Sequence, residues 1–156
     1  MRRIALALAL ALCLPVPALA APCETPANAA SLRSEVVALA NNQRKAKGLP
    51  PLSAHPALTG AAQDHTCDNA ANMRMSHEGS DGSTLPARMK RAGYGFREIA
   101  ENVAAGYFDA PSVMSGWMNS KGHRRNILGR SLQDVGIGVA RGADGQLYWT
   151  MDLGRD

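Results

Sequence analysis

Two histidines and one glutamate, in three separate segments, are the residues of this chain best suited to chemistry. The segments are Ser76-His77-Glu78-Gly79, Ala100-Glu101-Asn102-Val103-Ala104, and the run from Trp117 to Leu128 that contains His123. Imidazole groups exchange protons near neutral pH and bind metals, and a carboxylate can act as a base or hold an imidazole in place. If folding brings the three together, they predict a polar pocket in which His77 and His123 could bind zinc or another divalent metal.

Glu101 is the most informative of the three residues. Strand alternation over residues 97–105 places it on one face with Ile99 and Val103, the face more apt to be buried. A buried carboxylate needs a cation, a backbone donor, a histidine or a metal beside it. Glu101 is therefore the candidate catalytic residue, and the alternative is that it only bonds to amides of a neighbouring loop.

The remaining candidates are weaker. We expect His55, which precedes a proline, to be solvated, and His65 to be packed within a helix. The serines, among them Ser76, Ser83 and Ser120, lie in no G-x-S-x-G elbow, so a serine hydrolase has little support.

The N-terminus is typical of a secretory signal peptide. Arg2 and Arg3 precede an apolar run at residues 4–14, and Ala18-Leu19-Ala20 fits the small-x-small cleavage rule. The apolar run is about half the ~20 residues that span a bilayer, so we expect no membrane span once the chain is cleaved after Ala20. The predicted location is secreted or periplasmic.

Cleavage would remove two positive charges from a formal net charge of +4, so the pI of about 9.3 overstates the basicity of the mature chain. Aromatic residues are sparse and no basic stripe follows a helix, which argues against a nucleic-acid partner. One local basic cluster remains: Lys121, Arg124, Arg125 and Arg130. It is either a solvated loop face or a contact for anionic envelope material.

Cysteine usage agrees with export. Cys13 would leave with the signal peptide, and Cys23 and Cys67 would remain as an even pair in an oxidising compartment. We predict a disulfide between them, stabilising by roughly 4 kcal/mol in the chain-entropy model.

The order of elements predicts the fold class. After an irregular leader at residues 21–30 we expect a helix from Ser31, a second from about residues 53–56 to Met75, and a short one capped by Thr84. A strand at residues 97–105 and a helix capped by Asp109 precede a C-terminal hairpin that turns at Asp144-Gly145. This order predicts a single α+β domain over residues 31–156, with helices flanking a small, mainly antiparallel sheet.

Large apolar side chains are expected to serve packing. Trp117 lies on the apolar face of a predicted helix, and Trp149 on the inward face of the hairpin. Four methionines are likewise expected to pack in the core, and the alternative is that they line an adaptable apolar groove. They are Met73, Met75, Met114 and Met118.

Taken together, these motifs resemble the CAP superfamily of cysteine-rich secretory, antigen 5 and pathogenesis-related 1 proteins, in its bacterial secreted branch. The resemblance covers about residues 31–154. It rests on Asn42-Gln43-Arg44, Ser76-His77, Glu101-Asn102-Val103-Ala104, Trp117 to Leu128, and Val135-Gly136-Ile137-Gly138-Val139.

The resemblance implies an α-β-α sandwich whose central cleft is lined by two histidines and two glutamates, with a divalent metal in some members. His77, Glu101 and His123 match three of the four positions. Ala100 stands where the family has a glycine, and Ser120 where it has the second glutamate. The cleft is thus expected to involve His77, Glu101, His123, Asn102 and Ser120.

The hypothesis that follows is a secreted binding module whose cleft holds a divalent metal, a lipid or an envelope ligand. One alternative is a metal-dependent hydrolase with Glu101 as the base. The other is a purely structural role, in which the polar residues hold loops over the core.

Overall fold

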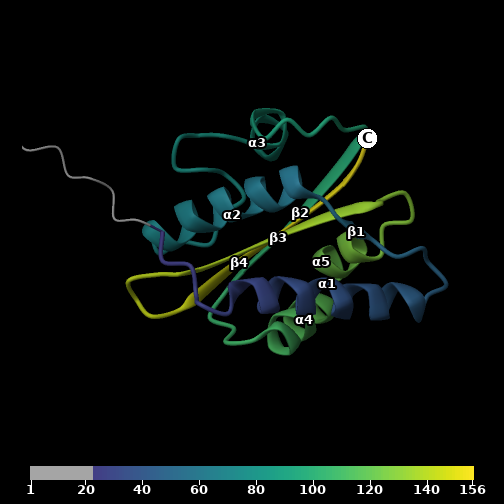
Figure 1. Ribbon diagram of the computed structural model, residues 1–156, viewed down its shortest axis with the longest axis horizontal. Coiled ribbons are helices and arrows are strands. Elements are labelled where there is room, and N and C mark those ends of the chain that lie inside the picture. The colour runs from purple at the N-terminus through teal and green to yellow at the C-terminus, as the bar shows by residue number, and fades with distance from the viewer. Residues whose placement is uncertain (1–22) are drawn as a thin grey trace, which may run out of the picture.

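The computed structural model describes residues 23–156, and the predicted signal peptide lies outside the described residues. Within this part the chain forms three layers, with helices on both sides of a sheet (Figure 1). The helices are α1 (Ala29–Lys45), α2 (Pro56–Ala71), α3 (Leu85–Arg91), α4 (Ala110–Asn119) and α5 (Lys121–Ile127). The strands are β1 (Ser53–Ala54), β2 (Glu98–Ala105), β3 (Asp134–Arg141) and β4 (Leu147–Arg155). The predicted α+β class and the α-β-α sandwich are confirmed.

The sheet has the order β1-β3-β4-β2, so β2 is an edge strand although it precedes the hairpin in the chain. The β2–β4 and β3–β4 pairs are antiparallel, and the two-residue β1 pairs with β3 in parallel. The register aligns Glu101 of β2 with Asp152 of β4, and Asp152 with Gly136 of β3. This row of three residues runs across the sheet beneath α2 and α3.

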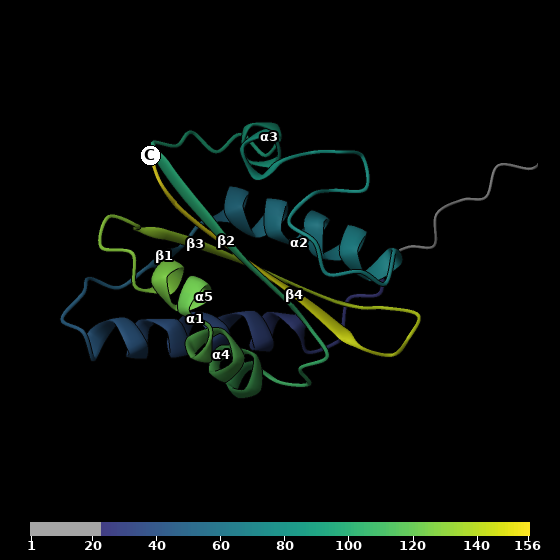
Figure 2. The same cartoon turned by 180° about the vertical axis from the view of Figure 1, so that it is seen from behind.

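One face of the sheet carries the main apolar core. α1, α4 and α5 lie on this side in both views (Figure 2). Trp117 and Trp149, both 1% exposed, pack here as predicted. Around them lie apolar side chains from α1, α4, α5 and the three longer strands, among them Leu32, Val36, Val113, Ile127, Val135, Ile137, Val139, Met151 and Leu153.

The opposite face, under α2 and α3, is built differently. Its strand positions include Gly136, Gly138, Thr150 and Asp152, and the apolar clusters on it are small. A Cβ at Gly136 would overlap the backbone of Leu58, and one at Gly138 the backbone of Ala62. The two glycines therefore let the backbone of α2 lie directly on β3.

Several predicted boundaries differ from the structure. α2 ends at Ala71 rather than near Met75, and Met73 has a φ of +46°, which is incompatible with a continuing helix. Met73 and Met75 are exposed, so their predicted packing role was wrong, whereas Met114 is buried. The predicted helix was too long because the polar-apolar pattern of the sequence continues beyond Ala71, where the helix ends in the structure.

Two elements were missed. Residues 121–127 form the helix α5, so three members of the basic cluster, Lys121, Arg124 and Arg125, lie on a helix and not on a loop. The strand β1 was also missed, because two exposed residues carry no periodic signal.

Two sets of interactions between remote segments fix how the layers pack together. The predicted Cys23–Cys67 disulfide is present and ties the N-terminal segment to α2. Buried Arg44 at the end of α1 donates hydrogen bonds to the carbonyls of Pro50, Ile127, Gly129 and Leu132. Arg44 thereby fixes the end of α5, the helix that carries His123.

Among residues 23–156, no helix is both long enough and apolar enough to cross a membrane.

Candidate functional site

The site is organised around the Glu101 carboxylate, whose residue is 6% exposed. Arg88 of α3 donates from Nη2 to Glu101 Oε2 at 2.5 Å, and the Nδ1 atom of His77 lies 2.8 Å from Glu101 Oε1. His65 of α2 places Nε2 3.8 Å from Oε2. Burial alone would raise the pKa of Glu101, but the His77 hydrogen bond and the Arg88 charge outweigh it and lower that pKa.

His77 is the part of this network that faces solvent. Its side chain is 61% exposed, in the loop between α2 and α3. The hydrogen bond to Glu101 raises its pKa above the usual value. Because Nδ1 is held by the carboxylate, Nε2 is the nitrogen left to meet a ligand.

A second carboxyl group, Asp152, lies across the strand pair from Glu101. Asp152 is fully buried, and neither of its oxygens has a hydrogen-bond partner among the described residues. Burial and the neighbouring Glu101 charge raise its pKa well above the ordinary value. Two buried carboxylates this close do not both ionise, so Asp152 carries the proton and Glu101 the charge.

The free edge of β2 positions His123. Asn126 of α5 donates to the Glu101 carbonyl at 3.1 Å, and the Trp117 indole donates to the Val103 carbonyl at 3.3 Å. Asn102 donates to the His123 carbonyl at 3.2 Å. The first two bonds cover carbonyls on the otherwise unpaired edge of β2, and the three bonds together fix α4 and α5 against that strand. Burial and the charge of His77 lower the pKa of the His123 ring, so the two imidazoles are electrostatically coupled.

A cleft of about 400 Å³ opens at this place and is lined by His77, Glu78, Thr84, Leu85 and Glu101. The structure thus brings His77 and Glu101 into direct contact at one cleft. His123 and Ser120 are half-buried and lie outside its lining, and Asn102, fully buried, points to the opposite face of β2 from Glu101.

Sequence reasoning missed Arg88, His65 and Asp152. His65 was predicted to be packed, and it is 1% exposed, but its closeness to Glu101 was not foreseen. A cation was expected near Glu101, yet nothing distinguished Arg88 from Lys90 or Arg91 in the same short helix. Asp152 could have been found by its place among the apolar residues of the last strand.

The described residues do not form a metal centre with three protein ligands. Among residues 23–156, no group of three or more His, Cys, Asp or Glu side chains is arranged to hold a metal ion. Both Glu101 oxygens are bonded to His77 and Arg88, and Ser120 offers no carboxylate. Catalytic zinc sites use three protein ligands, and here two imidazoles are the donors available.

The arrangement also limits the chemistry of Glu101. A carboxylate held by an arginine and a histidine, with a lowered pKa, is a poor general base. The geometry favours another role for Glu101. It orients the His77 ring and favours the protonated form of that ring, as the buried acid of a catalytic triad does for its histidine.

Comparison with known proteins places the chain in a family. Residues 37–153 match the model of the cysteine-rich secretory protein family, CAP. The chain belongs to this family. A curated relative, the uncharacterized protein YkwD of Bacillus subtilis, is 30% identical over 128 residues, which are 82% of this chain and 49% of the relative.

Solved structures share the fold of this domain. The SCP-domain extracellular protein of Bacillus anthracis superposes with a TM-score of 0.74 at 29% identity, over 81% of this chain and 41% of that one. An outer surface protein of Borrelia burgdorferi has a TM-score of 0.72 at 19% identity, over 78% of this chain and 90% of that one. The first shows the domain as one part of a larger protein. This chain likewise spans about half of YkwD.

Proposed function

We propose that this CAP domain is an extracytoplasmic binding module whose cleft at His77 takes an anionic ligand of the cell envelope. The observation that carries the proposal is the exposed imidazole of His77 held by the buried Glu101–Arg88 ion pair. Arg88 holds the Glu101 carboxylate, and the hydrogen bond from that carboxylate fixes the His77 ring and favours its protonated form, which presents a cationic N–H donor to the cleft.

Export is part of this proposal. It is supported by the signal-peptide pattern, by the Cys23–Cys67 disulfide and by the similarity to an extracellular protein. Measuring the mass of the protein recovered from a periplasmic or culture fraction tests both export and cleavage after Ala20.

Basic residues on the neighbouring helix α5 favour an anionic ligand, although the cleft lining also holds Glu78 and Glu101. His123 lies close enough to His77 for their charges to repel, and exposed Lys121, Arg124 and Arg125 lie on the same helix as His123. Positive charge at a cleft raises the local concentration of anions.

Binding is tested with N-acetylmuramic acid, which carries a carboxylate, and with inorganic phosphate. NMR titration of the histidine ring signals should show His77 shifting first, with tighter binding below its pKa than above it. His77→Gln should weaken binding at least about tenfold, since a charge-assisted hydrogen bond is lost. The matched control is His55→Asn, which keeps an acceptor at the start of α2, where His55 caps the Ala57 N–H at 3.2 Å. Equal affinities for both variants would refute the proposal.

A metal remains a narrower prediction. His77 Nε2 and the ring of His123 are the available metal ligands, so a zinc ion bound there would have two protein ligands and would exchange readily. Calorimetry with Zn²⁺ alone tests this, because a double His77→Ala, His123→Ala variant must then lose the binding.

Hydrolysis is the second candidate, and one observation favours it. His77 with Nδ1 on a buried carboxylate has the geometry of a general acid–base histidine. Peptides, esters and cell-wall fragments should be screened, and a genuine activity should fall in His77→Gln and follow the His77 pKa. A purely structural network would instead show a lowered Tm in Glu101→Gln with unchanged binding and turnover.

A further inference from the structure

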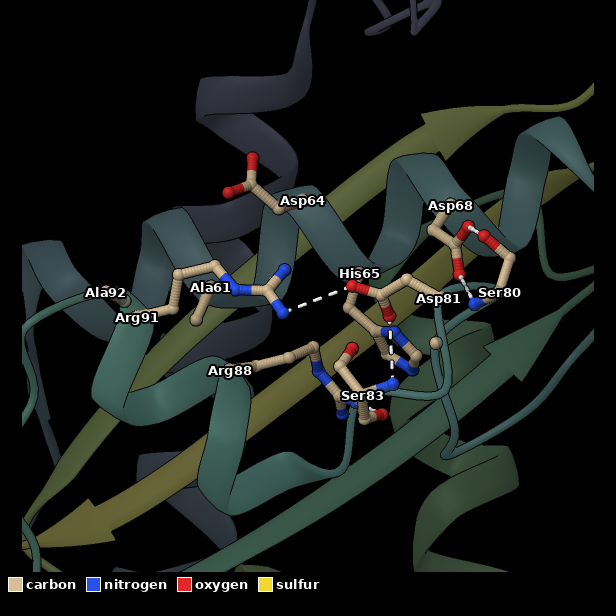
Figure 3. A pocket seen from close by; sticks show the side chains of 11 residues that line it. Ala61, Asp64, His65, Asp68, Ser80, Asp81, Ser83, Arg88, Arg91 and Ala92 are labelled. Carbon is tan, nitrogen blue, oxygen red and sulfur yellow. Dashed lines mark hydrogen bonds and ion pairs between the residues drawn. The ribbon is translucent and has the colours of Figure 1, made fainter.

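A second pocket lies on the α2–α3 side of the sheet, apart from the His77 cleft. It has a volume of about 250 Å³ and opens between α2, the loop at residues 79–83 and α3 (Figure 3). No residue lines both this pocket and the cleft. The proposed function uses Arg88, which lines this pocket, only through its bond to Glu101, and leaves the pocket itself without a role.

Two of the three aspartates that line this pocket accept hydrogen bonds from other residues of its wall. Asp68 accepts from the N–H of Ser80 at 2.8 Å and from the Ser80 hydroxyl. Asp81 accepts from the Ser83 N–H at 2.9 Å and from Arg91 at 3.1 Å. The Ser83 hydroxyl and N–H, followed by Arg91, lower its pKa to about 2. Both carboxylates thus fix the loop in place.

The third aspartate is free. Asp64 lies at the rim, one residue before His65 on α2, and is exposed. The Asp64 carboxylate has no hydrogen bond or ion pair with any other residue of the described part. The pocket therefore carries one carboxylate that is available to a positively charged ligand.

The inner wall holds two polar atoms without partners. His65 is 1% exposed, and its Nε2 lies 2.8 Å from the Ser76 carbonyl, so Nε2 carries the proton and Nδ1 is an acceptor. Arg88 is 6% exposed and uses both terminal nitrogens, on the carbonyls of His77 and Ser83 and on Glu101. His65 Nδ1 and the Arg88 Nε–H have no partner among residues 23–156. Figure 3 shows the two side chains pointing toward one another from α2 and α3.

Buried donors and acceptors without partners are destabilising, so a ligand that bonds to both of these atoms would be favoured here. A hydroxyl group satisfies both atoms, since it donates to the histidine nitrogen and accepts from the arginine N–H. A divalent cation does not fit, because no metal-holding group of three such side chains exists in the described part and Arg88 is itself positive.

We propose that this pocket binds a small primary amino alcohol, with its ammonium group on Asp64 and its hydroxyl group between His65 Nδ1 and Arg88 Nε. Amino sugars and ethanolamine head groups share this chemistry. The probes D-glucosamine and ethanolamine separate the two sources.

The experiment is an amide NMR titration of the mature chain with each probe. The amide signals of Ser80 and Ser83, which form the wall, should shift with saturation while those near His77 move less. N-acetylglucosamine, which keeps the hydroxyls but has no ammonium, should bind at least about tenfold more weakly, because a hydrogen bond to a charged group is lost.

The variant Asp64→Asn should weaken glucosamine or ethanolamine binding by a similar factor. Its control is Glu35→Gln, which removes an exposed carboxylate on α1, on the other side of the sheet. Saturation by one probe alone supports the proposal and identifies the source of the ligand. The proposal is overturned if neither amine shifts the wall amides, if N-acetylglucosamine binds equally well, or if Asp64→Asn keeps the parent affinity.

Discussion

The two faces of the sheet are packed with different kinds of side chain. Under α1, α4 and α5 the strands present large apolar side chains, with Trp117 and Trp149 at the centre. Under α2 and α3 the same strands present glycines, Thr150, Asp152 and Glu101, and the helices add His65 and Arg88. One face supplies hydrophobic stabilisation, and the other places charged groups where water is largely excluded.

The difference shows where function can be placed in a small domain. Apolar packing is non-directional and insensitive to pH, whereas a buried polar network depends on each partner and on its protonation state. The comparison predicts that both faces tolerate substitution poorly, but that only the face under α2 and α3 does so in a pH-dependent way.

The largest effect is expected from Trp117→Ala, on the apolar face. Losing a fully buried indole should lower the free energy of unfolding by about 3–5 kcal/mol, by the same amount at pH 4 and pH 7. Urea unfolding at both pH values measures it. Phe108→Ala is the control, since that side chain is 77% exposed and its removal should change stability by under about 0.5 kcal/mol.

Arg88→Met should have a comparable effect at pH 7, about 3 kcal/mol, because Glu101 is left as a buried charge without its arginine. The pKa of Glu101 is lowered in the folded protein, so its stabilising contribution is present above the ordinary glutamate pKa of 4.5 and is lost as the pH falls through the lowered value. The difference from the parent should therefore shrink below pH 4.5. Arg91→Met, on the exposed side of the same helix, should cost less than about 1 kcal/mol. A pH-independent loss in Arg88→Met would show that packing, and not the ion pair, dominates.

Asp152→Asn should stabilise the protein at pH 7, on the order of 1 kcal/mol, because the folded state no longer has to keep a carboxyl group protonated. The raised pKa of Asp152 means that its cost is absent below the unfolded value near 3.8 and grows as the pH rises. The Tm of the variant and the parent should thus converge in acid and separate toward neutral pH. A variant less stable at pH 7 would contradict this assignment of the proton to Asp152.

His77→Ala should have the smallest effect, under about 1 kcal/mol, since the side chain is largely exposed and its bond to Glu101 is partly screened. A raised pKa means that the stabilisation is fully present below pH 6.5 and is lost as the pH rises through the folded value. The difference in Tm between parent and variant should be measurable at pH 6 and fade in mildly alkaline buffer. NMR titration of the His77 ring gives the folded pKa directly, which should exceed 6.5.

Much of the fold could be predicted because its signals are local. The hairpin followed from alternation and from Asp144-Gly145, and the helix with Asp109 as its cap followed from Pro111 and its apolar stripe; the Asp109 side chain accepts from the Ser112 N–H at 2.8 Å. The Cys23–Cys67 bond followed from counting cysteines. Each of these depends on a few neighbouring residues or on composition alone.

The site was predictable only in part. Alternation showed that Glu101 would be buried and would need a partner, and the sequence motifs singled out His77. The identity of the partner cation was not predictable, because Arg88, Lys90 and Arg91 follow one another on a short helix without a periodic signal. Ser120 and Asn102 illustrate the converse, since both lie near the site in sequence while neither lines the cleft.

By itself the sequence determined the elements, the class of fold, the disulfide and the need of Glu101 for a counter-charge, because propensity, period and burial of charge act locally on the chain. The tertiary structure alone decided that β2 lies at the sheet edge beside β4 and that Asp152 faces Glu101. It also decided that His65 and Arg88 meet at the same carboxylate and that a second pocket lies behind them. Those facts depend on how helices and strands remote in sequence pack together, and close approaches such as that of α2 onto Gly136 and Gly138 exist only once the whole sheet has formed.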